Sequence, residues 1–240
     1  MTSARTSPKA PARRGLFASP SSPRPFGAVL LDLDGCLVDS NDIHARAWSD
    51  ALARFGHSIP AARLRREIGK GGEELIRDFV RPAERHFLGA AMGRLQARLY
   101  LAAFRGGVRP FPGVTGIVRA MRRAGLPVVV ASSADRTVLS RALGLLRLRE
   151  ALSGATCADD VRKAKPFQDI FSVAISRFRL AGRNPVAVGD TPYDIGAAHQ
   201  IGLPCIAVLS GGFPRKSLAS ADAVFDGLAP MWRQGRGLFR

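Results

Sequence analysis

Short apolar runs alternate with amphipathic segments along most of the chain after Phe26. A short apolar run bounded by turn residues is typical of a strand in a parallel sheet, because both faces of such a strand are covered. The runs with this pattern are residues 28–34, 126–132, 185–190, 205–209 and 223–225. We expect these residues to form the strands of one buried sheet.

Apolar residues at helical spacing lie between these runs. One set follows the first run and stops near Gly56, a residue type that commonly ends helices; another precedes the run at 185–190. The two sets are Ile43, Ala47, Ala51, Leu52 and Phe55, and Ile170, Phe171, Ala174, Ile175 and Phe178. Alternating strands and helices predict an α/β fold, a Rossmann-like three-layer core with helices on both faces of a parallel sheet.

The stretch 41–108 interrupts the alternation. It is Arg-rich, has helical spacing and contains no clear strand, and Pro110 and Pro112 break the chain after it. We therefore predict a helical cap at 41–108, inserted into a core formed by 26–40 and 109–232.

Residues 1–25 have a different composition. They are rich in Ser, Pro, Ala and Arg, contain no acid and show no periodicity, so they cannot bury enough apolar surface to fold. A transit peptide has a similar composition, but no amphipathic helix is visible here. We predict a disordered basic tail.

The chain is strongly basic, with 36 Lys and Arg against 19 acids and a net charge of +17. Such a charge would suit a nucleic-acid partner. However, the basic residues are scattered singly and aromatics make up only 7% of the chain, whereas nucleic-acid binders more often cluster the two. A small anionic substrate suits the charge equally well, and nucleic acid is not the expected partner.

Other features also limit the function. No apolar run reaches the roughly 18 residues that a membrane-spanning helix needs, so we expect no membrane role. Cys36, Cys157 and Cys205 are an odd number without C-x-x-C spacing, which indicates neither a disulfide framework nor a zinc site. A cytoplasmic protein is the natural interpretation.

Polar residues cluster where the predicted strands end. In open α/β sheets ligands bind beyond the carboxyl ends of the strands. The first strand run ends in Asp32-Leu-Asp34-Gly35, and Gly35 allows a tight turn and a close approach to phosphate. Ser132-Ser133 and Asp190 end two other strand runs. Lys165 precedes Pro166 in a loop before a helix, and Asp194 lies about one turn into the helix that follows Asp190.

These residue types fit phosphoryl transfer. Mg²⁺ prefers carboxylates combined with substrate phosphate oxygens, and a carboxylate can attack phosphorus to give an aspartyl phosphate. A lysine with Mg²⁺ would offset the charge of the transferring group. A second carboxyl group can protonate the leaving alcohol and later activate water.

Four motifs in this order resemble the haloacid dehalogenase-like phosphohydrolases. The motifs are Asp32-Leu-Asp34-Gly35, Ser132, Lys165-Pro166 and Gly189-Asp190-x-x-x-Asp194, and the resemblance covers about residues 27–230. Each motif is weak alone, but their order and their places at strand ends make the set specific. One departure is Cys36, where the family often has Thr; we expect its side chain to pack.

The resemblance implies a role for each residue. Asp32 would be the nucleophile and a Mg²⁺ ligand, and Asp34 the general acid and base, with its backbone carbonyl also on the metal. Ser132 and Lys165 would hold phosphoryl oxygens. Asp190 would complete the metal site, and Asp194 would support it or orient Lys165.

The cap resembles that of the subgroup with phosphoglycolate phosphatases and β-phosphoglucomutases. Gly69-Lys70-Gly71-Gly72 resembles its substrate-facing loop, although a plain turn between helices with a solvated Lys70 fits equally well. His44 would help position the acid/base residue, as in mutases, or is an ordinary helix histidine. We count Gly35, Ser133, His44 and Lys70 as candidate substrate-binding residues.

The function expected from the sequence is Mg²⁺-dependent hydrolysis of a small phosphomonoester, such as phosphoglycolate or a sugar phosphate. The spacing Asp190-x-x-x-Asp194 is closer to the phosphatase form of this motif than to the mutase form, which more often pairs adjacent acids. A β-phosphoglucomutase-like phosphomutase is the alternative, and a non-catalytic basic protein that binds nucleic acid is a weaker one. We expect a monomer or a weak dimer.

Overall fold

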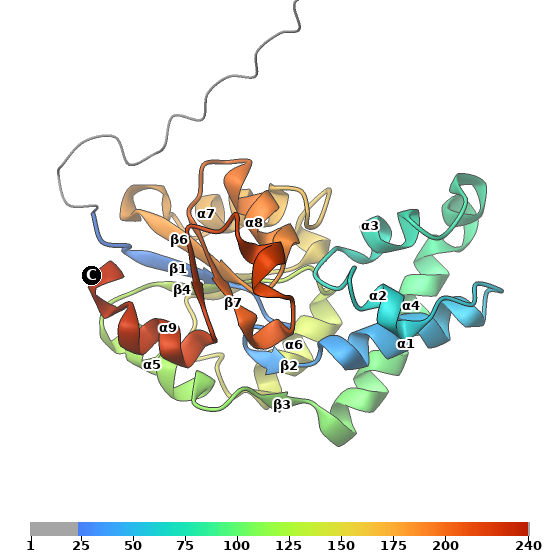
Figure 1. Cartoon of the computed structure of the whole chain (residues 1–240), viewed down its shortest axis with the longest axis horizontal. Helices are drawn as coiled ribbons and strands as arrows, with labels where there is room; N and C mark the ends of the chain where they lie inside the picture. The colour runs from blue at the N-terminus through green and yellow to red at the C-terminus, as the bar shows by residue number, and fades with distance from the viewer. Residues whose placement is uncertain (1–23, 240) are drawn as a thin grey trace, which may run out of the picture.

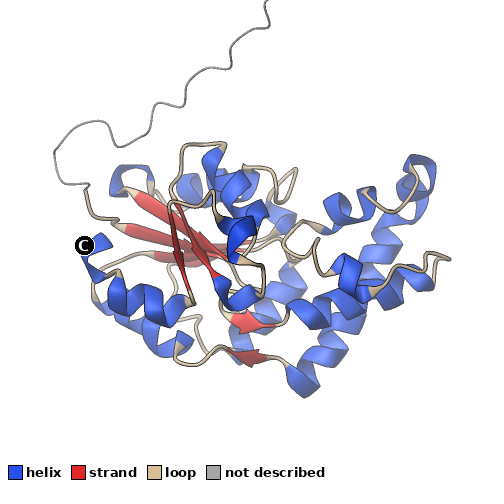
Figure 2. Ribbon diagram, viewed as in Figure 1, coloured by secondary structure: helices blue, strands red, loops and turns tan. Residues whose placement is uncertain are grey.

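The core is a six-stranded sheet in which every neighbouring pair is parallel (Figures 1 and 2). The structure is a computed structural model that describes residues 24–239. In spatial order the strands are β5 (Gly154–Thr156), β4 (Val128–Ala131), β1 (Ala28–Leu31), β6 (Pro185–Gly189), β7 (Cys205–Val208) and β8 (Ala223–Phe225). The predicted α/β fold with a parallel sheet is confirmed.

Alternate residues of the strands face opposite layers. Val29 and Leu31 pack with one apolar cluster, whereas Ala28 and Leu30 pack with the other. The first cluster includes residues of α5 (Val114–Arg123), α6 (Arg136–Leu145) and α9 (Leu228–Gln234), and the second includes residues of α7 (Asp169–Arg177) and α8 (Pro192–His199). Helices therefore cover both faces, which explains why the strands are apolar along their whole length.

Short 3₁₀ turns connect several of these elements. They are η1 (Ala158–Asp160), η2 (Ala181–Arg183), η3 (Leu209–Gly211), η4 (Arg215–Leu218) and η5 (Arg236–Leu238). Of these, η3 follows β7 directly and lies against the site described below.

Four helices lie between the first strand and the rest of the core, and they project to one side of the sheet (Figure 1). They are α1 (Asn41–Ala53), α2 (Ala61–Leu64), α3 (Gly72–Arg77) and α4 (Pro82–Gly107). Their apolar cluster includes Trp48 and Met92 and is distinct from the two clusters of the sheet. At the base of this cap, β2 (Val38–Asp39) pairs antiparallel with β3 (Arg109–Pro110). The helical insertion expected as part of the fold is present.

Some predicted strands are longer than the observed ones, and three observed strands were not predicted. The first run was expected to continue through residue 34, but β1 ends at Leu31 and the two acids lie in the turn beyond it. The strand β5 was not predicted, because Gly154–Thr156 has almost no apolar signal. Both β2 and β3 contain only two residues, too few for a periodic pattern to be visible.

The predicted N-terminal tail and the expected lack of a membrane-spanning helix can be compared with the structure only over the described residues. Most of the predicted tail, residues 1–23, lies outside the described residues; the carbonyl oxygens of Arg24 and Pro25 accept hydrogen bonds from Asn184 Nδ2. Within residues 24–239, no helix combines the length and the apolar character that crossing a membrane requires.

Candidate active site

The candidate residues meet at the carboxyl edge of the sheet. Asp32 directly follows β1, Ser132 follows β4 and Asp190 follows β6. These three strands are neighbours at the centre of the sheet. All three side chains are buried. Because parallel strands end at the same edge, residues about 60 to 160 positions apart in the chain become neighbours.

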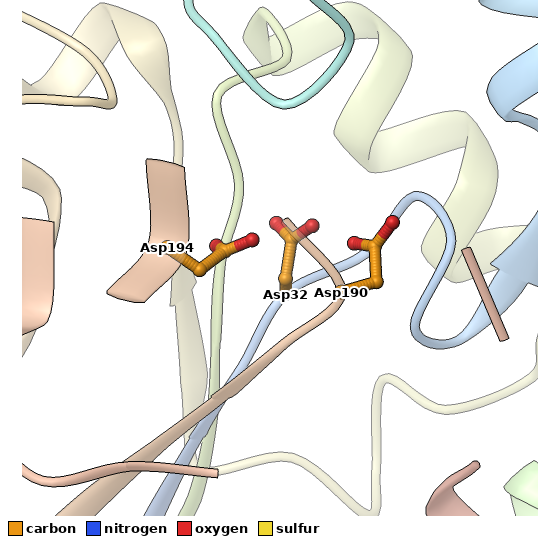
Figure 3. Close-up of side chains that lie close together, drawn as sticks. All are labelled: Asp32, Asp190 and Asp194. Atoms are coloured by element: carbon orange, nitrogen blue, oxygen red, sulfur yellow. The ribbon is translucent and has the colours of Figure 1, made fainter. Parts of the chain in front are cut away.

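Three carboxylates converge here (Figure 3). One oxygen from each of Asp32, Asp190 and Asp194 lies within 4.8 Å of the others, and all three residues are buried. Asp194 is held by a capping box at the start of α8, where its Oδ2 accepts hydrogen bonds from the backbone and the hydroxyl of Thr191 at 3.1 and 2.6 Å. Helix capping thus aims this carboxylate back at the strand end.

Lys165 places a buried cation among these acids. Its Nζ lies 2.6 Å from Asp32 Oδ1 and 2.7 Å from Asp194 Oδ1, and it also donates to the carbonyl of Ala131 at 2.8 Å. Burial would lower the pKa of Lys165, but the charges of Asp194 and Asp32 outweigh it and raise the pKa above its usual value. Lys165 is therefore a fixed positive charge.

One cation does not balance three acids. Burial raises the pKa of Asp32 from 3.8 to about 7; the charge of Lys165 opposes the rise and that of Asp194 adds to it. Burial, together with the charges of Asp32 and Asp194, also raises the pKa of Asp190 well above its usual value. The site carries an excess of negative charge that a cation would relieve.

Asp190 has a buried carboxylate oxygen without a hydrogen-bond partner among the described residues. Its Oδ2 accepts from Asn41 Nδ2 at 2.9 Å, whereas its buried Oδ1 has no hydrogen-bond partner within the described part of the chain. Two glycines leave room for this carboxylate: a Cβ on Gly35, which has a φ of 76°, or on Gly211 would overlap it. An unpartnered buried carboxylate oxygen beside Asp32 is what a divalent metal would use.

Asp34 faces the cap. Its Oδ1 accepts from Ser40 Oγ at 2.5 Å and from the Tyr100 hydroxyl at 2.9 Å, and it lies 3.3 Å from His44 Nε2. Burial would raise the pKa of Asp34, but His44 and the hydrogen bonds from Ser40 and Tyr100 outweigh it and lower the pKa. His44 thus lies against the expected acid/base residue.

The glycine-rich cap loop lies on the core. Ser133 Oγ donates to the carbonyl of Gly69 at 3.2 Å, and the backbone N–H of Gly71 donates to the carbonyl of Lys165 at 2.9 Å. Ser132 Oγ accepts from the backbone of Ala134 at 3.1 Å, which leaves its proton available to a ligand. These contacts bring the loop to the edge of the sheet where the acids lie.

Lys70 is not brought into the cluster. Its Nζ pairs with Glu67 at 2.5 Å and with Asp78 at 2.7 Å, and it lies 5.0 Å from the ring centroid of Tyr193. The Lys70 ammonium is thus paired with two carboxylates outside the cluster of acids, and its role as a substrate ligand stays a prediction.

Sequence reasoning missed several residues of the site. Asn41 bridges Asp190 and the carbonyl of Gly211, and Tyr100 and Gln96 reach the Asp34 region from α4. Asn41 lies only a few residues after the Asp32-Leu-Asp34-Gly35 motif, which is a weak sign that it belongs to the site. Nothing in the local pattern of a long cap helix marks Gln96 or Tyr100. Cys36 is fully buried in the core, as expected.

Several relatives with similar sequences are phosphatases by name. The chain is 31% identical over 189 residues to a phosphoglycolate phosphatase of Yersinia pseudotuberculosis, which covers 76% of this chain and 81% of the relative. It is 29% identical over 217 residues to a plasmid phosphoglycolate phosphatase of Cupriavidus necator, covering 85% and 90% of the two chains.

Solved structures share the fold. A hydrolase from Pseudomonas syringae superposes with a TM-score of 0.80 at 22% identity and covers 89% of this chain and 99% of that one. CbbY from Rhodobacter sphaeroides in complex with phosphate gives 0.71 at 25% identity, covering 86% and 96%.

Residues 26–202, well over half of the chain, match the family described as haloacid dehalogenase-like hydrolase. The match and the phosphatase relatives confirm the expectation of a phosphatase of this family. The chain belongs to the haloacid dehalogenase-like hydrolases.

Proposed function

We propose that this protein is a Mg²⁺-dependent phosphomonoester hydrolase that works through an aspartyl phosphate on Asp32. The observation that carries the proposal is the pairing of Asp32 with Lys165 Nζ at 2.6 Å, next to the unpartnered oxygen of Asp190. A buried carboxylate beside a fixed cation and a second carboxylate with an unpartnered oxygen provide the parts that phosphoryl transfer needs.

The protein residues divide the work over two steps. In the first, an Asp32 oxygen forms a bond to phosphorus and the ester P–O bond breaks, while Asp34 gives its proton to the departing alcohol. Because the pKa of Asp34 is lowered, only the small protonated fraction of the enzyme at neutral pH starts this step. In the second, Asp34 takes a proton from water, the water oxygen bonds to phosphorus, and the bond from phosphorus to Asp32 breaks. Phosphate leaves and both acids return to their starting state.

Other residues would bind and orient. Lys165 and the hydroxyl of Ser132 would hold phosphoryl oxygens, and the backbone at Gly35 would let the phosphate approach. Asp194 fits the role of orienting Lys165, since its Oδ1 lies 2.7 Å from Nζ and its Oδ2 is taken by Thr191.

The donor set fits Mg²⁺. Asp32, Asp190 and the backbone carbonyl of Asp34 would hold the ion, all through hard oxygen atoms. When bound, it would offset the negative charge of the acids and of the transferring phosphoryl group. The raised pKa values of Asp32 and Asp190 support this need for a cation.

The proposed substrate is a small phosphorylated metabolite. The phosphoglycolate phosphatases among the relatives favour phosphoglycolate or a similar small ester. Ser133 and His44, which contact the cap loop and Asp34, are the candidate residues near the leaving group. A cytoplasmic location and a monomeric or weakly dimeric state remain predictions.

The test is phosphate release from a panel that includes phosphoglycolate, several sugar phosphates and p-nitrophenyl phosphate, with Mg²⁺ or with EDTA. We expect wild-type release to need Mg²⁺ and Asp32→Asn to abolish it. Asp50→Asn, which changes an exposed acid of α1, is the matched control and should remain active. Release by Asp32→Asn at the wild-type rate would contradict the proposed nucleophile.

A phosphomutase is the second candidate, because His44 contacts Asp34 as the mutase interpretation requires. A mutase would isomerise a sugar phosphate, would require a bisphosphate for activity and would release little phosphate. Product analysis of the same reactions separates the two activities.

A further inference from the structure

The acid/base carboxylate is anchored through one of its two oxygens. The hydroxyls of Ser40 and Tyr100 donate to Asp34 Oδ1, and His44 Nε2 lies 3.3 Å from the same atom. Within residues 24–239, no hydrogen bond reaches Oδ2. A carboxylate held in this way has one fixed oxygen and one that is available for proton exchange.

A second cap residue determines how His44 takes part. Gln96 Nε2 lies 3.0 Å from His44 Nδ1. An amide nitrogen only donates, so Nδ1 accepts, and the proton of a neutral imidazole then sits on Nε2, which faces Asp34. His44 also stacks on Tyr100, with ring centroids 3.7 Å apart and an interplanar angle of 13°.

These contacts come from two helices of the cap. Gln96 and Tyr100 lie one turn apart on α4, and His44 lies on α1. Tyr100 is fully buried and Gln96 is nearly so. Both polar groups would be costly to bury if they were not hydrogen-bonded. The structure directs the Tyr100 hydroxyl to Asp34 and the Gln96 amide to His44, which lies against Asp34.

We propose that Tyr100 and Gln96 are positioning residues for proton transfer by Asp34, Tyr100 through its hydroxyl and Gln96 through His44. This inference rests on the proposed function. The anchored Oδ1 fixes the carboxylate, and Oδ2 gives the proton to the leaving alcohol and later takes one from water. The cap thereby sets the orientation of the acid/base group as well as covering the site.

How much the first reaction step depends on the orientation of Asp34 differs between esters, whereas the second step depends on it for all of them. An alkyl phosphate has a poor leaving group and needs Asp34 as the acid in the first step. A p-nitrophenyl ester has a good leaving group and does not, yet its aspartyl phosphate still needs Asp34 as the base in the second step. A misplaced Asp34 should therefore affect the two esters differently.

The experiment compares Tyr100→Phe and Gln96→Leu with wild type on p-nitrophenyl phosphate and on the alkyl phosphate of the panel that is cleaved fastest. For the alkyl ester we expect kcat to fall about tenfold with KM nearly unchanged. For the aryl ester we expect a burst of p-nitrophenolate equal to the enzyme concentration, followed by slow turnover. Folding of each variant is checked by circular dichroism.

Tyr193→Phe is the matched control. Its hydroxyl also joins cap and core, donating to the carbonyl of Arg66 at 2.8 Å, but it does not contact Asp34. We expect no burst from it. If both folded variants slow the two esters equally without a burst, or slow neither, the positioning role is wrong while the proposed function stands. No release by wild type from either ester would overturn both.

Discussion

Replacing Asp32 by Asn should stabilise the metal-free protein, increasingly so as the pH rises. Burial is the main reason that the pKa of Asp32 rises from 3.8 to about 7, because the pairing with Lys165 does not recover the lost hydration. The amide of Asn resembles the protonated acid in shape, and its oxygen can still accept from Lys165. The substitution thus removes the charge without removing the contact.

The magnitude follows from proton linkage. Between pH 4 and pH 7 the folded state binds the Asp32 proton more tightly than the unfolded state does, so wild-type stability falls as the pH rises through this window. A rise from 3.8 to about 7 corresponds to about 4 kcal/mol at pH 8, and to less than half of that at pH 5. For a chain of this size, 4 kcal/mol corresponds to about 10 °C in Tm.

The assay is thermal unfolding followed by circular dichroism at pH 5 and pH 8, in EDTA and in Mg²⁺. In EDTA, Asp32→Asn should have the higher Tm, with the larger gain at pH 8, and the control Asp50→Asn should match wild type. Mg²⁺ should raise the wild-type Tm by binding only the folded state, and should raise that of Asp32→Asn less. A lower Tm for Asp32→Asn at pH 8, or a gain independent of pH, would refute the electrostatic reasoning.

Three further substitutions test other contacts. Lys165→Met should abolish activity and destabilise the metal-free protein by about 3 kcal/mol at pH 8, since it leaves buried carboxylates unpaired; an unchanged midpoint in urea would contradict this. Gly211→Ala should weaken Mg²⁺ activation about tenfold, because a Cβ would overlap the Asp190 carboxylate; Gly116→Ala, where a Cβ meets open space, is the control in the Mg²⁺ titration. Burial would raise the pKa of Asp160, but hydrogen bonds from Arg177 and Arg136 outweigh it and lower the pKa. Asp160→Asn should therefore lower the stability at pH 7, and the loss should shrink as the pH falls below about 4. A difference in Tm that stays constant with pH would contradict this role of Asp160.

The layers of the fold and the residues at the strand ends were predictable from sequence. Buried parallel strands are apolar on both faces, so the runs around Val29, Val129 and Val188 are visible without a structure. The topology of such sheets places ligands at the carboxyl edge, so Asp32 and Asp190 could be named as neighbours in advance. The strand β5 could not be found, because its residues 154–156 are held by pairing with β4 and not by their own apolar character.

The partners of the site residues were not predictable. The contacts of Asp34 with Tyr100 and of Asp190 with Asn41 span 66 and 149 residues of sequence. Each depends on how the cap packs against the core, and a single hydroxyl or amide on a helix carries no periodic signal. The sequence likewise left two interpretations of Lys70 open, and it gave no sign of the two acids, Glu67 and Asp78, that pair with its ammonium.

The sequence by itself determined the α/β core, the position of the helical insertion and the set of acids, lysine and serine at strand ends and in the loops beyond them. These features depend on local periodicity and on a general rule for where parallel strands end. Only the tertiary structure decided the charge balance of the site, the unpartnered oxygen of Asp190 and the anchoring of Asp34 by the cap. Those properties arise from burial and from distances between atoms of segments far apart in the chain, which no local pattern encodes.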